Sequence, residues 1–320
     1  MYGQTFTDAL GIKLTERTKK PRTHGITMII DVGHTWREVS DVLEAYGAFI
    51  DVVKIADPNI TQPLSEIAKK VGLLRAHNVE AQPGGIFIEI ARWQNKLHEV
   101  LTKLREIGFT QIEVSSTATA LGDMSEEEKV IRLARDLGFI VYGEVGKKFS
   151  EGDKTRKGDA TIDVEETISE MRSCLSAGAE HVYWEGHLLR RVMGETPSQI
   201  LERQSSFEPI FERIDREIGA QHIVFEVSAM VPYVTRRSMQ FWLVRMFGPN
   251  VNIGNVQLHE VGYLEATRHG TLPIFGFGPA GDHPWINSLA KHDGKEGEKW
   301  WQEFPAYRTA EFLEKPSEKS

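Results

Sequence analysis

Short apolar runs recur along the chain, and a segment with helical spacing of its apolar residues follows each of them. The eight runs occupy residues 26–31, 50–56, 79–83, 111–116, 140–146, 181–186, 222–227 and 251–256. Their shortness and their β-branched residues predict strands rather than pieces of helix. The segments between them, such as residues 37–49, predict amphipathic helices, and start signals at Asp163 and Thr196 support two of these.

The order of these elements predicts the fold class. Eight strands that alternate with eight helices over about 250 residues are typical of an α/β protein with a (β/α)8 TIM barrel. A doubly wound open sheet is the alternative. That fold usually carries a glycine-rich phosphate turn after its first strand, and residues 31–36, DVGHTW, do not match one. The sequence therefore predicts a barrel.

We expect the barrel to cover residues 20–275, between an N-terminal extension of residues 1–19 and a C-terminal extension of residues 276–320. The C-terminal extension holds three tryptophans: Trp285, Trp300 and Trp301. Tryptophans are unusual in a purely disordered tail. We expect this extension to be a strap that packs on the barrel or on a neighbouring subunit, and a lid over the active site is the alternative.

Composition and charge narrow the classes of partner. The formal net charge of −8 argues against general nucleic-acid binding, which needs surplus lysine and arginine. No apolar run approaches the roughly 20 residues of a membrane-spanning helix, and the start of the chain lacks the apolar core of a signal peptide. The single cysteine, Cys174, allows no disulfide within the chain. We expect a cytoplasmic homo-oligomer that binds neither nucleic acid nor membranes.

The alternation of side chains along a strand places carboxylates inside the barrel. When the apolar residues of each strand face the helices, four consecutive strands each bring one inward glutamate to their carboxyl ends: Glu113, Glu144, Glu185 and Glu226. Ser115 shares the inward face with the first of them. Asp31 ends the first strand, and Lys54 and Gln82 lie near the ends of the next two. Active sites of this fold lie at that end of the barrel.

A group of buried carboxylates favours a metal site. Burial of several carboxylates together is costly unless cations or protons neutralise them, so we expect lysines and a divalent cation nearby. Oxygen ligands favour Mg²⁺, with Mn²⁺ as an alternative. The candidate ligands are Asp31, Glu113, Glu144, Glu185 and Glu226. A structural set of ion pairs is the alternative interpretation.

Other kinds of site receive less support. The histidines lack zinc-binding spacing, and only His187, directly after the residues WEG, lies beside the expected site. No serine occupies a nucleophile-elbow turn, and Cys174 lies in a helical segment, so acyl transfer is not expected. Gly254 would let an anion approach the backbone near the last strand, and Arg268 would add charge there.

Six segments in order along the chain resemble one known family. They are KPRTHGITMIID (20–31), QPGGIFIE (82–89), GEVGKK (143–148), WEGH (184–187), IVFEV (223–227) and FGPNVNIGNV (247–256). Together they resemble the phosphosulfolactate synthase family, known from coenzyme M biosynthesis. The resemblance covers roughly residues 20–270.

This resemblance implies a (β/α)8 barrel that adds sulfite to phosphoenolpyruvate with Mg²⁺. The acid proposed for the family is the second lysine of the GKK motif, which corresponds to Lys148. The resemblance also implies supporting roles for Lys147, Glu144 and His187. A small anionic substrate is the expected partner. The predicted substrate-binding residues are Arg22, Lys54, Gln82, Ser115, Gly254, Asn255 and Arg268.

The chain also departs from the family pattern, mainly where cations bind anions. Val32 replaces a lysine, residues 56–59 (ADPN) replace Gly-Trp-Gly-Thr, and His187 replaces an arginine. Of three arginines that close the family pattern, only Arg268 is kept. Each lost charged hydrogen bond to an anion costs about 1.5–3 kcal/mol. The metal and lysine side of the site is thus kept, while the anion-recognition side is changed.

Three hypotheses follow from this pattern. The first is addition of sulfite to phosphoenolpyruvate. The second is the same chemistry on a less charged or bulkier enolate-forming substrate. The third is a non-catalytic barrel, since plant heat-stress-associated proteins also resemble the family. In either catalytic case we expect residues 149–162 to form a mobile loop that closes over the ligand.

Overall fold

The computed structural model describes residues 5–12, 14–115, 124–146 and 162–271. Its centre is an eight-stranded parallel sheet with the strand order β3-β2-β1-β8-β7-β6-β5-β4. The strands are β1 Thr27–Asp31, β2 Val52–Ile55, β3 Glu80–Pro83, β4 Gln111–Val114, β5 Ile140–Val145, β6 His181–Trp184, β7 Ile223–Glu226 and β8 Asn252–Gln257. The sheet curls so that β3 and β4 meet, and the backbone N–H of Thr110 donates to the carbonyl of Ala81 at 3.1 Å.

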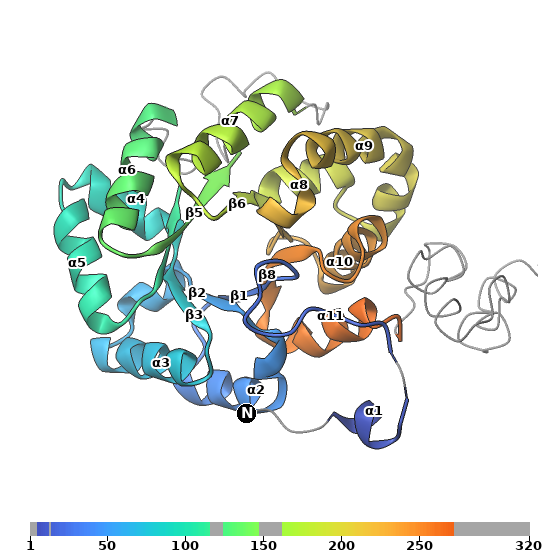
Figure 1. Cartoon of the computed structure of the whole chain (residues 1–320), viewed down its shortest axis with the longest axis horizontal. Coiled ribbons are helices and arrows are strands. Elements are labelled where there is room, and N and C mark those ends of the chain that lie inside the picture. Colours follow the sequence, from blue (N-terminus) through green and yellow to red (C-terminus); the bar gives the residue numbers. More distant parts are fainter. Residues whose placement is uncertain (1–4, 13, 116–123, 147–161, 272–320) are drawn as a thin grey trace, which may run out of the picture.

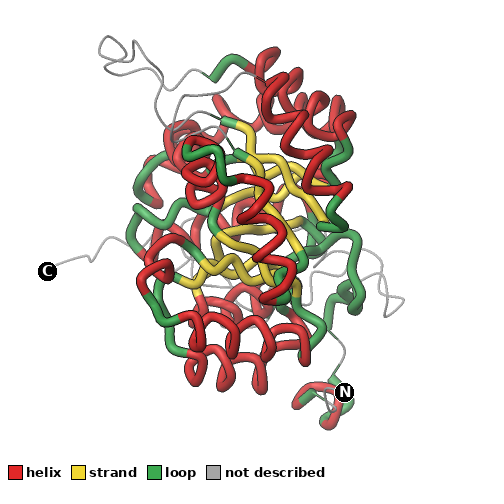
Figure 2. Tube along the Cα trace, turned by 90° about the vertical axis from the view of Figure 1, so that its left-hand side faces the viewer, coloured by secondary structure: helices red, strands yellow, loops and turns green. Residues whose placement is uncertain are grey.

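Helices surround this nearly closed barrel, as Figures 1 and 2 show from two directions. They are α2 Trp36–Tyr46, α3 Leu64–Ala76, α4 Gly85–Trp93, α5 Leu97–Ile107, α6 Met124–Asp136, α7 Val164–Ala177, α8 Gly186–Met193, α9 Pro197–Ile218, α10 Tyr233–Phe247 and α11 Val261–Arg268. The short helix α1 Phe6–Ala9 lies apart from this ring and buries no residue. The predicted (β/α)8 TIM barrel is confirmed. Two of its units carry an extra helix, because α4 and α5 both follow β3 and α8 and α9 both follow β6.

Two of the helix starts that the sequence indicated are capped as expected. The Asp163 side chain accepts the backbone N–H of Glu166 at 3.0 Å, and the Thr196 hydroxyl accepts that of Gln199 at 3.2 Å. Both bonds satisfy donors that the first helical turn leaves without an intrahelical partner. None of the helices in the described ranges is both long enough and apolar enough to cross a membrane.

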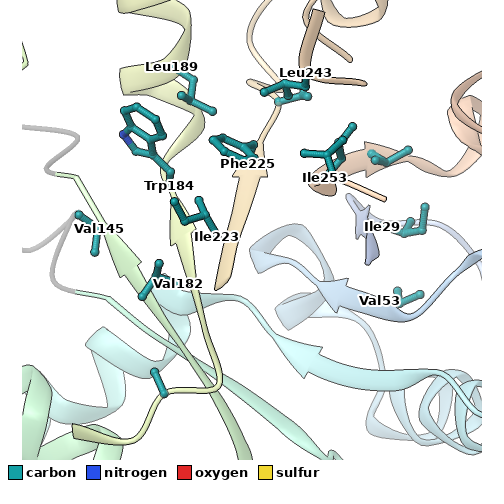
Figure 3. Packing of buried hydrophobic residues seen from close by; sticks show 14 of the residues in the cluster. Ile29, Val53, Val145, Val182, Trp184, Leu189, Ile223, Phe225, Leu243 and Ile253 are labelled. Carbon is teal, nitrogen blue, oxygen red and sulfur yellow. The ribbon is translucent and has the colours of Figure 1, made fainter. Parts of the chain in front are cut away.

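Strand alternation divides the core into two layers. The outer layer lies between sheet and helices and includes Ile112, Val182 and Phe225, which the sequence assigned to the helix side; Figure 3 shows part of it. The inner layer lies within the barrel and consists of Ile26, Met28, Val52, Tyr142, Tyr183 and Val224, with Ile140 packed against it. The predicted direction of these strands is therefore correct. On β2, β5 and β7 the next inward residues toward the carboxyl ends are polar: Lys54, Glu144 and Glu226.

Buried arginines fasten the N-terminal segment to the amino-terminal end of the barrel. Arg17 pairs with Glu265 at 2.5 Å, and Arg22 pairs with Asp51 at 2.8 Å. Arg268, which has no exposed surface, donates to the carbonyl of Val251 at 2.7 Å. Arg17 was assigned to an extension, but these contacts make it part of the barrel's packing.

The contacts of these buried arginines lead to a prediction about stability. Replacement of Arg22 by Met should lower the free energy of unfolding by about 3 kcal/mol, because it leaves a nearly buried Asp51 carboxylate without its cation. Arg172→Met is the matched control: its bridge to Glu217 is more than one-third exposed on both sides and should cost at most about 1 kcal/mol. Urea unfolding of both variants measures the difference. Equal losses would contradict the structural role given to Arg22.

Candidate active site

Three inward glutamates converge at the carboxyl ends of the strands. Glu113 on β4, Glu144 on β5 and Glu226 on β7 each offer a carboxylate oxygen, and these oxygens lie within 4.8 Å of one another. Each side chain belongs to a residue that is at most 2% exposed. Within the described ranges this is the one group of three or more histidine, cysteine or acidic side chains close enough to hold a metal ion. We call these three residues the carboxylate trio.

The ammonium group of Lys54 lies against the trio. Its Nζ is 2.6 Å from Oε2 of Glu113 and 2.7 Å from Oε1 of Glu226. The ring of Tyr183 faces the same ammonium group, with Nζ 4.8 Å from the ring centroid. Burial by itself lowers the pKa of Lys54, but attraction to Glu113, Glu226 and Glu144 outweighs burial and raises the pKa above its usual range. Lys54 therefore carries a positive charge where it lies against the trio.

Two hydrogen bonds in series connect Glu113 to Gln82 and Gln82 to Tyr183. The amide Nε2 of Gln82 donates to Oε2 of Glu113 at 2.7 Å, and the hydroxyl of Tyr183 donates to Oε1 of Gln82 at 2.7 Å. Burial, with added repulsion from Glu113, raises the pKa of Tyr183 well above its usual value. The hydroxyl thus keeps its proton and stays a donor.

The start of α4 closes in on the same carboxylate. A Cβ atom at Gly85, the first residue of α4, would lie 2.4 Å from Oε1 of Glu113 and 2.9 Å from Oγ of Ser115. Ser115 in turn donates to the buried Glu89 on α4. Sequence reasoning missed Gly85 and Glu89 as parts of the site. The glycine pair in QPGGIFIE was the available signal, because paired glycines before a helix indicate close approach of other groups.

Asp31 lies near the strand ends but belongs to a different network. Lys70 on α3 donates to Oδ2 of Asp31 and to Oδ1 of Asn59, both at 2.7 Å. The other carboxylate oxygen of Asp31 accepts the backbone N–H groups of Gly33 and His34. The network links the segments after β1 and β2 to α3. The structure does not bring Asp31 into the carboxylate trio.

Glu185 and His187 lie at the start of α8. Oε2 of Glu185 accepts the backbone N–H of His187 at 2.6 Å and that of Leu188 at 3.2 Å, so this carboxylate caps the helix. β6 ends at Trp184, and strand alternation therefore no longer sets the direction of Glu185. It stands outside the trio that the predicted metal ligands Glu113, Glu144 and Glu226 form.

The remaining predicted substrate contacts are not all at the mouth. Arg22 and Arg268 lie at the opposite, amino-terminal end, where protein groups engage both. A role in binding a substrate at the mouth does not fit their position. Arg22 precedes β1 in the chain. Arg268 is the last residue of α11, which runs back along the barrel, so Arg268 reaches the start of β8 rather than the end of β8.

The last strand offers less open backbone than expected. A Cβ at Gly254 would meet the side chains of Met28 at 2.9 Å, Val224 at 3.1 Å and Glu226 at 3.3 Å, so packed side chains fill that space. Asn255 has a positive φ of 53°, and its carbonyl accepts a bond from the buried Arg236. Lys147, Lys148 and residues 149–161 of the expected loop lie outside the described residues.

The close contact at Gly85 leads to a prediction about stability, with Gly72 on α3 as the control. Gly85→Ala should destabilise the protein by about 1–3 kcal/mol, because the new Cβ overlaps the fixed Glu113 carboxylate. Gly72→Ala on α3, where a Cβ meets nothing within 4 Å, should instead stabilise it by up to about 1 kcal/mol. Thermal and urea unfolding compare the two. A stabilising Gly85→Ala would show that Glu113 is not held against α4.

The chain is similar to proteins of one known family. Residues 15–272 match the family described as (2R)-phospho-3-sulfolactate synthase (ComA). The phosphosulfolactate synthase of Methanothermobacter thermautotrophicus is 30% identical over 257 residues, which span 79% of this chain and 92% of that protein. That of Methanocaldococcus jannaschii is 26% identical over 247 residues, 77% of this chain and 91% of its own. That of Bacillus subtilis is 27% identical over 263 residues, 81% and 95% respectively.

The match covers the whole described barrel, including the strands that carry the trio and Lys54. The relatives are named as synthases, so the expectation of a carbon–sulfur lyase-like enzyme is confirmed at the level of enzyme class. Its identity to these relatives is 30% or lower, so the chain is a divergent member of the family that the six sequence segments resemble. The chain belongs to the (2R)-phospho-3-sulfolactate synthase family.

Proposed function

We propose that this protein is a Mg²⁺-dependent synthase that adds sulfite to phosphoenolpyruvate and forms phosphosulfolactate. The observation that carries the proposal is the carboxylate trio with Lys54 at the mouth of the barrel. The names of the relatives support the product, and the trio supports the metal.

The donor set and its charge fit a magnesium ion. Mg²⁺ prefers oxygen ligands at 2.0–2.1 Å, so two opposite ligands are about 4.2 Å apart. Neighbouring ligands of such an ion are about 2.9 Å apart. The carboxylate oxygens of the trio, within 4.8 Å of one another, would therefore draw together around the ion. Glu113 and Glu226 carry two formal negative charges against the one positive charge of Lys54, so a bound cation would add the positive charge that this pair lacks. Glu113, Glu144 and Glu226 would hold the ion, whose positive charge would stabilise the enediolate.

The proposed reaction is a conjugate addition. The sulfur lone pair of sulfite forms a bond to the methylene carbon of phosphoenolpyruvate, and the double-bond electrons move onto the carboxylate to give an enediolate. That intermediate then takes one proton at the adjacent carbon, which restores the carboxylate. The phosphate ester stays intact. The protein has to bind two anions, stabilise added negative charge and deliver one proton.

The lysines divide these tasks. Lys54 contacts both Glu113 and Glu226, so its proposed role is to hold these two carboxylates in place and to add positive charge. Lys148 of the GKK motif is the proposed acid, and Lys147 adds charge beside it. Glu144 lies on β5, three residues before Lys147 and four before Lys148, so both lysines follow a proposed metal ligand closely in the sequence.

A less anionic substrate is the second candidate. The position of Arg268 at the far end favours it, because the one arginine kept from the closing family pattern does not reach the mouth. Val32 and His187 likewise stand where the family has cations. On this alternative the metal and lysine chemistry is the same, and only the groups that bind the substrate anions differ.

The metal proposal predicts a distinction among the glutamates. Calorimetric titration with Mn²⁺ should give binding to the wild-type protein, and Glu226→Gln should weaken it by about tenfold or more through loss of a charged ligand. Glu185→Gln is the matched control: it should bind Mn²⁺ like the wild type, because Glu185 caps α8. Equal weakening in both variants would place Glu185 in the metal site and contradict the trio.

The reaction itself is tested by phosphorus NMR of phosphoenolpyruvate incubated with Mg²⁺, sulfite and protein. The expected result is conversion to a saturated phosphoester that requires both sulfite and metal. Lys148→Met should abolish turnover and leave Mn²⁺ binding unchanged, because it removes the acid and no metal ligand. Unchanged phosphoenolpyruvate with a metal-loaded protein would reject this substrate pair and leave the less anionic substrate as the better candidate.

A further inference from the structure

We propose that Tyr183 is a positioning residue for the metal site, and that its hydroxyl orients Glu113 through the side-chain amide of Gln82. The inference rests on the proposed function, because it takes the carboxylate trio as the site of the divalent cation. It gives Tyr183 and Gln82 a role that they exert through Glu113.

The chemistry of the groups fixes the direction of the chain of hydrogen bonds. A carboxylate can only accept, so Gln82 must present its NH₂ group to Oε2 of Glu113. Its carbonyl oxygen must then face Tyr183, which is why the Tyr183 hydroxyl donates. A flipped amide would place two acceptor oxygens against each other. All three groups are buried, so solvent cannot take over these bonds.

The hydrogen bond from the Gln82 side chain is one of several contacts that hold the Glu113 carboxylate in place. Oε2 of Glu113 receives Gln82 at 2.7 Å and Lys54 at 2.6 Å, and Oε1 lies against Gly85 at the start of α4. A carboxylate held at both oxygens cannot rotate freely about its last bond. Residues that orient a metal ligand in this manner typically change metal affinity by 10- to 100-fold when they are removed.

Tyr183 makes a second, separable contact. Its ring faces the ammonium group of Lys54 at 4.8 Å, while its hydroxyl reaches Gln82. Tyr183→Phe therefore removes only the hydroxyl and keeps the ring beneath the lysine. Tyr142 provides a matched control, because it is a buried tyrosine of the same inner layer whose ring centroid is 5.3 Å from that of Tyr183.

The test is Mn²⁺ affinity, measured by calorimetry on folded full-length variants. Tyr183→Phe should weaken binding by about tenfold, and Tyr142→Phe should stay within about twofold of the wild type. Gln82→Met, which keeps the length of the side chain and removes its hydrogen bonds, should weaken binding by a similar factor. Because Tyr183 acts through Gln82, adding Tyr183→Phe to Gln82→Met should cause no further loss.

Each other outcome overturns a defined part of the account. A wild-type protein that binds no Mn²⁺ removes the proposed function together with this inference. A wild-type protein that binds Mn²⁺, with Tyr183→Phe equally tight, removes the inference alone. Additive losses in the double variant would show that Tyr183 acts independently of Gln82. Should Tyr183→Phe fail to fold, an unchanged affinity of Gln82→Met would overturn the inference by itself.

Discussion

The mouth of this barrel depends on the burial of three carboxylates around one lysine. Charged groups removed from water are costly unless other charges or hydrogen bonds replace their hydration. Lys54 binds two members of the trio directly, and its raised pKa keeps it charged. Glu113 and Glu226 share that single ammonium group, so two buried carboxylates face one positive charge. This imbalance is the physical basis for proposing a divalent cation at the trio.

The two ends of the barrel use charge for different purposes. At the amino-terminal end, Arg17, Arg22 and Arg268 are matched to carboxylates or backbone carbonyls, and these contacts hold the N-terminal segment in place. At the carboxyl end, the carboxylates of Glu113, Glu144 and Glu226 converge, and Lys54 binds two of them. Stability and function are therefore separated along the axis of the barrel, as is general for this fold.

Much of this arrangement could be predicted from the sequence because strand alternation is a strong constraint. The order of strands and helices predicted the barrel, and side-chain alternation predicted the inward direction of Glu113, Glu144 and Glu226. It failed for Glu185, which follows the last residue of β6 and belongs to the turn into α8. Alternation says nothing about residues beyond a strand's end.

Long-range partners were the other limit. Asp31 was predicted as a metal ligand together with the trio, but it lies outside that group and pairs with Lys70, 39 residues later on α3. The partner lies on a helix whose rotation about its axis the sequence pattern does not fix to within one residue. The Tyr183–Gln82–Glu113 chain joins three strands by side-chain hydrogen bonds, which leave no periodic signal in the sequence.

The central claim is that a divalent cation occupies the carboxylate trio, and anomalous X-ray diffraction from crystals soaked in Mn²⁺ tests it most directly. The account predicts one strong anomalous peak within ligand distance of Glu113, Glu144 and Glu226, with Lys54 still beside them. A peak at Asp31 or at Glu185, or a trio bound by Lys54 alone in a Mn²⁺-soaked crystal, would contradict it.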